Sequence, residues 1–244
     1  MSHAERQQAA IDFRQLLDKA AQQVADPWFA LPYSSWNVTT TQNAYRERVY
    51  CYELYHQIRV LSDSDGRAAG APLFVASGEL NKSGLHSVIQ GGKHQPDLVW
   101  HVPGNAHENA VVVEIKSLPG FMKHGPRKDL ETLAAFLEAG ERSYERGILL
   151  IYGSLVPHRH HHEVYDQQSG PPRIRARVLE TADELQAKAT DEGETKNSPQ
   201  VARHRPTKGN ALSDDARRRI SVLWHPHVGQ NLNDLGTLER LPIA

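Results

Sequence analysis

Apolar residues recur at helical spacing in two segments of the first sixty residues. A loose apolar stripe predicts a helix over residues 4–24. A second helix is predicted over about 42–60, and Glu53 interrupts its otherwise mostly apolar or aromatic face. The residues that define this face are Val49, Glu53, His56 and Val60.

Short apolar runs then predict three consecutive strands. They are, in order, "LFVASGEL", "PDLVWHV" and "VVVEIKS". An apolar stripe at i, i+3, i+4 and i+7 predicts a helix over about 127–140, and "GILLIYG" predicts one more buried strand. This order of elements predicts an α/β fold, with a mixed central sheet flanked by helices.

Three regions are expected along the chain. Residues 1–41 form an N-terminal helix and an aromatic loop that pack on the core, and residues 42–180 form the core itself. Residues 181–244 form a polar, partly flexible C-terminal extension, because the stretch 181–210 is charged and poor in apolar residues. Before it, "RIRARVLE" has the pattern of a strand, and "RRRISVLWHP" has that of a returning strand or a docking segment.

Composition narrows the setting of the protein. The 244 residues carry a formal net charge of -1, which argues against a protein that coats DNA through an overall positive field. This net charge does not exclude an enzyme with a local basic cleft. Cys51 is the single cysteine, which excludes an intrachain disulfide and a cysteine zinc cluster and favours a cytoplasmic setting. No apolar run has the length of a membrane span, and the N-terminus lacks the apolar core of a signal peptide.

The strand "VVVEIK" contains two charges that need an explanation. Glu114 and Lys116 lie two residues apart, so their side chains share one side of a strand whose other residues are apolar. Burying charge is costly unless the charge is paired or used. The simple alternative is an exposed ion pair at a strand end, which contributes little to stability.

The preceding strand supplies a second carboxylate. Asp97 stands at its start, and a hairpin between the two strands brings Asp97, Glu114 and Lys116 to one end of the sheet, where Glu53 is also expected. Two neighbouring carboxylates repel each other, and a hard cation such as Mg²⁺ or Mn²⁺ relieves the repulsion. A carboxylate-bound metal beside a lysine suits phosphodiester hydrolysis, in which the lysine orients the attacking water and neutralises developing charge.

Pro96-Asp97 followed by Glu114-Ile115-Lys116 resembles the PD-(D/E)xK motif of the restriction-endonuclease-like nuclease superfamily. The order of elements over residues 42–153 is also similar to the core of that superfamily: a helix with an acidic residue, a three-strand meander with the motif, a helix and a further strand. The resemblance therefore implies a restriction-endonuclease-like core.

The resemblance also implies roles for single residues. Asp97 and Glu114 would be metal ligands, the backbone carbonyl of Ile115 would be a third ligand, and Lys116 would be the catalytic lysine. Glu53 would match the helix acid that binds or supports a second metal. The helix after the motif opens with Lys128 and Asp129, where relatives often place a polar residue that faces the substrate.

The expected function is that of a Mg²⁺-dependent nuclease that hydrolyses DNA in defence, repair or mobile-element biology. DNA is the expected partner, and a homodimer or a larger defence or repair complex is the expected assembly. One alternative is a non-catalytic member of the same fold that acts as a nucleic-acid-binding or assembly subunit. Another is an RNA or nucleotide phosphodiesterase.

Two further clusters have less specific patterns. His158–His162 is either a metal-binding run or, since it lacks the usual spacing of zinc ligands, a solvated loop. The arginines at 173, 175 and 177, with Arg217–Arg219, are either a phosphate-contacting surface or a solvated edge. Ser77, Ser87 and Ser117 form no nucleophile arrangement with the nearby histidines, which argues against a serine hydrolase.

Overall fold

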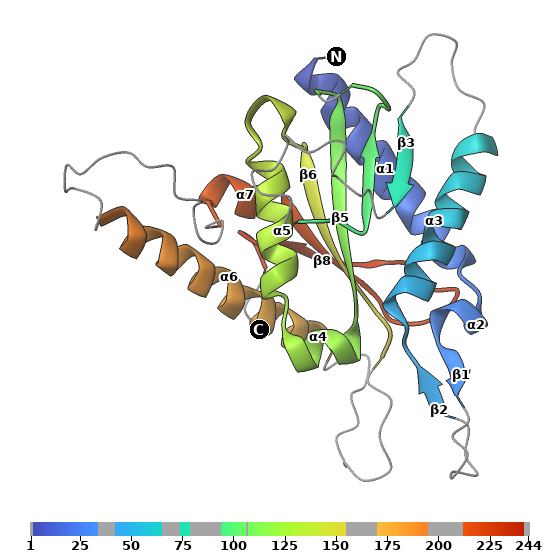
Figure 1. Ribbon diagram of the computed structural model, residues 1–244. Helices are drawn as coiled ribbons and strands as arrows, with labels where there is room; N and C mark the ends of the chain where they lie inside the picture. The colour runs from blue at the N-terminus through green and yellow to red at the C-terminus, as the bar shows by residue number, and fades with distance from the viewer. Residues whose placement is uncertain are drawn as a thin grey trace.

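The computed structural model describes residues 2–33, 42–64, 74–78, 94–105, 107–154, 170–194 and 212–241 (Figure 1). The helices are α1 (His3–Gln23), α2 (Asp26–Phe29), α3 (Glu47–Ser64), α4 (Leu118–His124), α5 (Arg127–Leu137), α6 (Gly170–Glu194) and α7 (Asp214–Arg219), with a 3₁₀ turn η1 at Gly140–Arg142. The strands are β1 (Leu31–Tyr33), β2 (Gln42–Ala44), β3 (Val75–Gly78), β4 (Leu98–His101), β5 (Asn109–Ser117), β6 (Arg146–Tyr152), β7 (Ile220–His225) and β8 (Asn233–Thr237).

A six-stranded mixed sheet forms the centre of the molecule, in the order β3-β4-β5-β6-β7-β8. β5, β6 and β7 are parallel, and the remaining neighbours pair antiparallel. A small antiparallel ribbon of β1 and β2 lies outside this sheet. The predicted α/β class, with a mixed sheet between helices, is confirmed.

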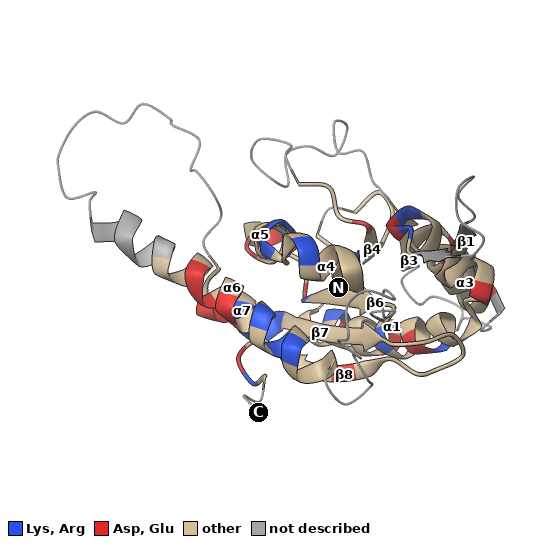
Figure 2. Cartoon of the chain, turned by 90° about the horizontal axis from the view of Figure 1, so that it is seen from below, with Lys and Arg blue, Asp and Glu red and all other residues tan. Residues whose placement is uncertain are grey.

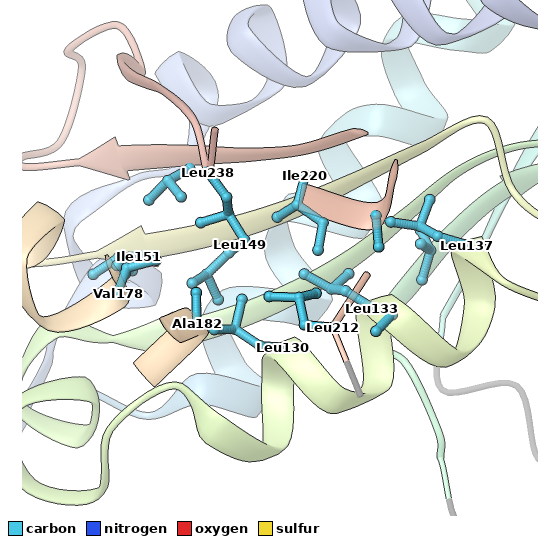
Figure 3. Close-up of a cluster of buried hydrophobic side chains, with 14 of the residues drawn as sticks. Leu130, Leu133, Leu137, Leu149, Ile151, Val178, Ala182, Leu212, Ile220 and Leu238 are labelled. Carbon is cyan, nitrogen blue, oxygen red and sulfur yellow. The ribbon is translucent and has the colours of Figure 1, made fainter. Parts of the chain in front are cut away.

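Helices cover both faces of the sheet, and β5 shows how its residues divide between them. Val111, Val113 and Ile115 belong to the core under α1 and α3, whereas Val112 belongs to the core under α5 and α6. This division follows from the two-residue period of a strand. Figure 3 shows the second core, in which leucines of α5 meet β6 and α6. Glu114 and Lys116 share the parity of Val112, so they face α5.

The carboxyl-terminal part of the chain differs from the prediction. The segment expected as a strand, 173–180, lies within helix α6, whose buried residues Ile174, Val178 and Ala182 recur every four positions. The stretch 181–194 continues this helix, so the expected linker is wrong there, and residues 195–210 lie outside the described part. The expected boundary at residue 180 falls inside α6, and β7 and β8 are strands of the central sheet.

None of the described helices is both long enough and apolar enough to span a membrane.

Candidate active site

The β4–β5 hairpin brings two carboxylates together at the carboxyl end of β5. Leu98 pairs with Val113 in the antiparallel register, so the next step places Asp97 opposite Glu114 on the face of the sheet that α5 covers. Asp97 Oδ2 accepts a hydrogen bond from the backbone N–H of Ile115 at 2.7 Å. The strand register and the two-residue period therefore place Asp97, Glu114 and Lys116 on one face at this end of the sheet, and the roles predicted for them stay predictions.

Glu114 is a buried carboxylate with an unsatisfied oxygen. Its residue exposure is 7%, and its Oε1 accepts no hydrogen bond from any described residue. Burial raises the pKa of Glu114 well above its ordinary value, and the negative charges of Asp97 and Asp129 raise it further, against a smaller opposing effect of Lys128 and Lys116. Binding of a proton or of a cation would stabilise this buried carboxylate oxygen.

Lys116 is held by a partner that the sequence pattern did not identify. Its Nζ lies 3.1 Å from Asp129 Oδ1 and 2.9 Å from Oδ2, and both side chains are mostly buried. Burial alone would lower the pKa of Lys116, but Asp129 outweighs it, aided by Glu47 and Glu114, and the pKa is raised. The ammonium is therefore charged and fixed in position on the same side of β5 as Glu114.

Asp129 lies in the first turn of α5, where a carboxylate is favoured by the helix dipole. Burial raises its pKa, and the ammonium of Lys116 opposes that effect without cancelling it. The polar residue expected at the start of this helix thus lies in the site, and its contact is with Lys116.

The carbonyl of Ile115 is placed to serve as a further oxygen ligand. Its N–H points toward Asp97 on the β4 side, and within a strand the N–H and C=O of one residue point the same way. The register would set Pro96 opposite Ile115, and a proline has no N–H to donate to that carbonyl. The end of β4 therefore leaves this oxygen without its ladder donor.

The printed contact of Glu53 lies within its own helix, so the described residues give no support to its predicted place at the site. Its Oε1 accepts from Gln57 Nε2 at 2.7 Å within its own helix. Helix α3 packs on the face of β5 opposite Glu114, and its buried residues include Tyr50, Leu54 and Ile58. The predicted stripe through Glu53 was displaced around the helix, and Val60 on that stripe is 49% exposed.

Glu47 is the acidic residue of α3 that contacts the end of β5. Its Oε1 accepts from the backbone N–H of Ser117 at 3.2 Å and from the Ser117 hydroxyl at 3.1 Å. A Cβ on Gly120 would lie 2.7 Å from the same oxygen, so glycine permits the close approach of α4. The signal in the sequence was available, since Glu47 precedes Tyr50 by three residues and extends the true buried stripe by one step.

The donor set suits a hard divalent cation. Among the described residues, no group of three or more His, Cys, Asp or Glu side chains is arranged as a metal cluster. Mg²⁺ needs fewer, because it commonly uses one or two carboxylates and completes its shell with water and substrate phosphate. The unsatisfied oxygen of Glu114 beside Asp97 fits that requirement.

Some of the remaining sequence candidates lie outside the described residues, and others make contacts elsewhere. His158–His162 and Ser87 lie outside the described residues. Ser77 bonds to His101 at 3.0 Å near the β3 edge of the sheet, and Ser117 caps α4 and bonds to Glu47.

No known family model matches this chain, and searches of the curated proteins and of the solved structures give no match either.

Proposed function

We propose that this protein is a Mg²⁺- or Mn²⁺-dependent nuclease of the PD-(D/E)xK type that hydrolyses phosphodiester bonds of DNA. The observation that carries the proposal is the unsatisfied, buried oxygen of Glu114 opposite Asp97, with a fixed lysine on the same face of β5. A purely structural ion pair would join Glu114 to Lys116, but Lys116 contacts Asp129 instead.

The residues divide the proposed work between them. Asp97, Glu114 and the Ile115 carbonyl would hold the metal, which when bound acidifies a water and polarises a phosphoryl oxygen. Lys116 keeps a positive charge beside the attacked phosphate and orients the water through its N–H groups. Asp129 holds that ammonium in place, and Glu47 fixes the strand end through Ser117. The expected setting remains the cytoplasm, in defence, repair or mobile-element biology, as a homodimer or part of a larger complex.

The test compares cleavage of supercoiled, linear and single-stranded DNA, and of RNA of the same sequence, with Mg²⁺ and with EDTA. Metal-dependent DNA cleavage that Asp97→Ala abolishes supports the proposal. Preferential cleavage of the RNA would reassign the substrate. Absence of cleavage, together with no rise in melting temperature on adding Mg²⁺, would leave a binding or assembly subunit as the better explanation.

The matched control is Asp12→Ala on α1. Asp12 is exposed, and its side chain accepts from Gln8 within the same helix. This variant should cleave like the unaltered protein. Circular dichroism of both variants separates loss of chemistry from loss of fold.

A further inference from the structure

The arginines of α6 divide between two flanks of the helix. Arg173 and Arg177 are four residues apart and share one flank, whereas Arg175 projects to the other side. A shared face for all three, as expected from a strand, is therefore excluded. The first flank faces the turn between α4 and α5, because Arg127 of α5 pairs with Glu184 of α6. The other flank faces α7, where Arg217 bonds to Asp183 at 2.8 Å.

Arg177 lies against the α4–α5 turn with an incompletely satisfied guanidinium. A Cβ on Gly125 would lie 3.6 Å from an Arg177 terminal nitrogen and 3.8 Å from its Nε. The side chain is half-buried, and its Nε donates to no described residue. A guanidinium that is partly removed from water gains most from an anionic acceptor such as a phosphate.

More cations surround the same turn. Lys123 and His124 occupy the last turn of α4, and Lys128 lies in the first turn of α5; all three are exposed. Figure 2 shows basic segments of the α4–α5 region close to basic segments in the amino-terminal part of α6. We define Lys123, Lys128 and Arg177 as the basic turn surface.

This surface begins beside the candidate active site. Lys128 adjoins Asp129, which holds Lys116, and its charge acts on Glu114. Lys123 lies near the far end of α4, a helix of 7 residues that begins directly after Ser117. Such a helix is about 10 Å long, which corresponds to about three nucleotide rises along one DNA strand.

We propose that the basic turn surface binds the phosphate backbone of the nucleic acid within about three nucleotides of the scissile bond. This inference rests on the proposed function for the site itself. The inference adds the direction in which the nucleic-acid backbone extends from the site, along α4 toward the amino-terminal part of α6. The binding is independent of base sequence, since the surface offers cations for phosphates.

The test measures the salt dependence of DNA affinity by fluorescence anisotropy, in EDTA and in the Asp97→Ala background so that the duplex stays intact. The slope of log K against log salt is negative, and each lost phosphate contact reduces its magnitude by about 0.9. The triple variant Lys123→Ala, Lys128→Ala, Arg177→Ala should reduce the magnitude of the slope by about 2 to 3. Because Arg177 is half-buried, the double variant at the two exposed lysines repeats the test, with an expected loss of about 2.

The matched control removes cations from the opposite face, with Lys19→Ala on α1 and Arg59→Ala on α3. Both side chains are exposed, and this double variant should keep the slope. An equal decrease in the control, or no decrease in the double lysine variant, overturns the inference while metal-dependent cleavage by the unaltered protein still upholds the nuclease. Absence of both DNA binding and cleavage overturns the two proposals together.

Discussion

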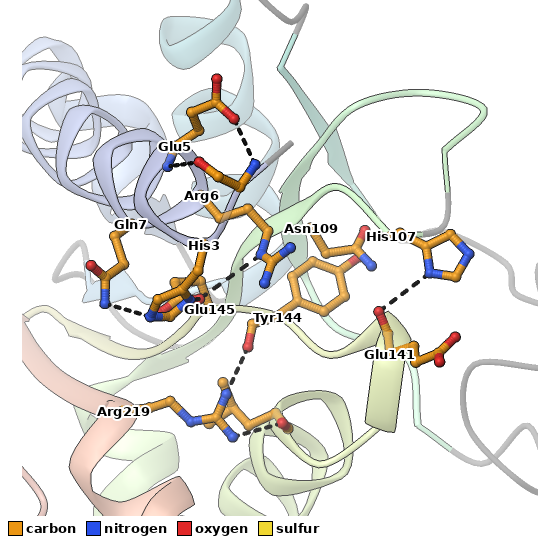
Figure 4. A network of polar contacts seen from close by, with 12 residues as sticks. His3, Glu5, Arg6, Gln7, His107, Asn109, Glu141, Tyr144, Glu145 and Arg219 are labelled. Atoms are coloured by element: carbon orange, nitrogen blue, oxygen red, sulfur yellow. Dashed lines mark hydrogen bonds and ion pairs between the residues drawn. The ribbon is translucent and has the colours of Figure 1, made fainter.

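Two buried glutamates at opposite ends of the sheet differ in what surrounds them. Glu114, at the carboxyl end of β5, and Glu145, just before β6, have the same residue exposure of 7%. Glu145 lies 3.1 Å from His3 Nδ1 and 4.0 Å from Arg6 Nε, both on α1 (Figure 4). Glu114 instead faces other carboxylates and has an oxygen without a described donor.

The difference shows how burial alone fails to identify a functional carboxylate. Arg6 and His3 of α1 contact the carboxylate of Glu145, and these contacts hold the N-terminal helix against the end of the sheet. The partners of Glu114 increase its electrostatic cost, because Asp97 and Asp129 are both acidic. A bound ligand can compensate such an arrangement, which is the reason for proposing a catalytic role for Glu114 and a structural role for Glu145.

The largest expected effect separates the two glutamates by activity. Glu114→Ala should lower metal-dependent cleavage by at least ~10²-fold, because it removes a proposed metal ligand. Glu145→Ala should cleave at a rate close to that of the unaltered protein once its folded fraction is accounted for. Steady-state cleavage of a labelled duplex measures both. Equal losses in the two variants would remove the distinction drawn between them.

Lys116→Ala should reduce turnover by roughly 10²-fold, because it removes the group proposed to orient the attacking water. Metal binding should persist or tighten, because a positive charge near the metal is lost. Calorimetric Mg²⁺ titration beside single-turnover rates measures this split. The variant leaves Asp129 buried without its partner, which destabilises the fold. Adding Asp129→Asn should restore stability but not turnover. Normal cleavage by Lys116→Ala would reduce "VVVEIK" to a structural strand.

Two acidic residues of α3 sharpen the comparison next. Glu47→Gln should lower cleavage by about 10-fold, the scale of an outer group that positions a metal site, because its two bonds to Ser117 are weakened. Glu53→Gln should have no measurable effect, since Glu53 bonds within its own helix. The same cleavage assay checks both. A larger loss for Glu53→Gln would restore the assignment made from the sequence pattern.

A further expected effect concerns the pH dependence of stability and not the activity. Because the pKa of Glu114 is raised in the folded state, that state binds the proton more tightly than the unfolded chain. The free energy of unfolding should therefore decrease as the pH rises from about 4.5 through the folded pKa, by at most about 1.4 kcal/mol per pH unit. Glu114→Gln should flatten this slope, and Glu145→Gln should leave it in place. Urea unfolding at pH 5 and pH 8, without metal, measures the difference.

The sequence by itself determined the elements and the local arrangement of the motif. Apolar runs defined β4, β5 and β6, and the i, i+3, i+4, i+7 stripe defined α5, because these periods are set by backbone geometry. The two-residue period also placed Glu114 and Lys116 on one side, and a short connection made the hairpin that adds Asp97.

The tertiary structure decided which partners those residues meet. Asp129 reaches Lys116 because the crossover from β5 to β6 lays the first turn of α5 over the strand end. Glu47, and not Glu53, contacts the end of β5, because α3 packs on the sheet through Tyr50 and its neighbours. The side of a helix that is buried depends on this packing. β7 joins the sheet across more than sixty residues beyond β6. Local periodicity fixes the side of an element, and contacts distant in sequence fix what lies opposite that side.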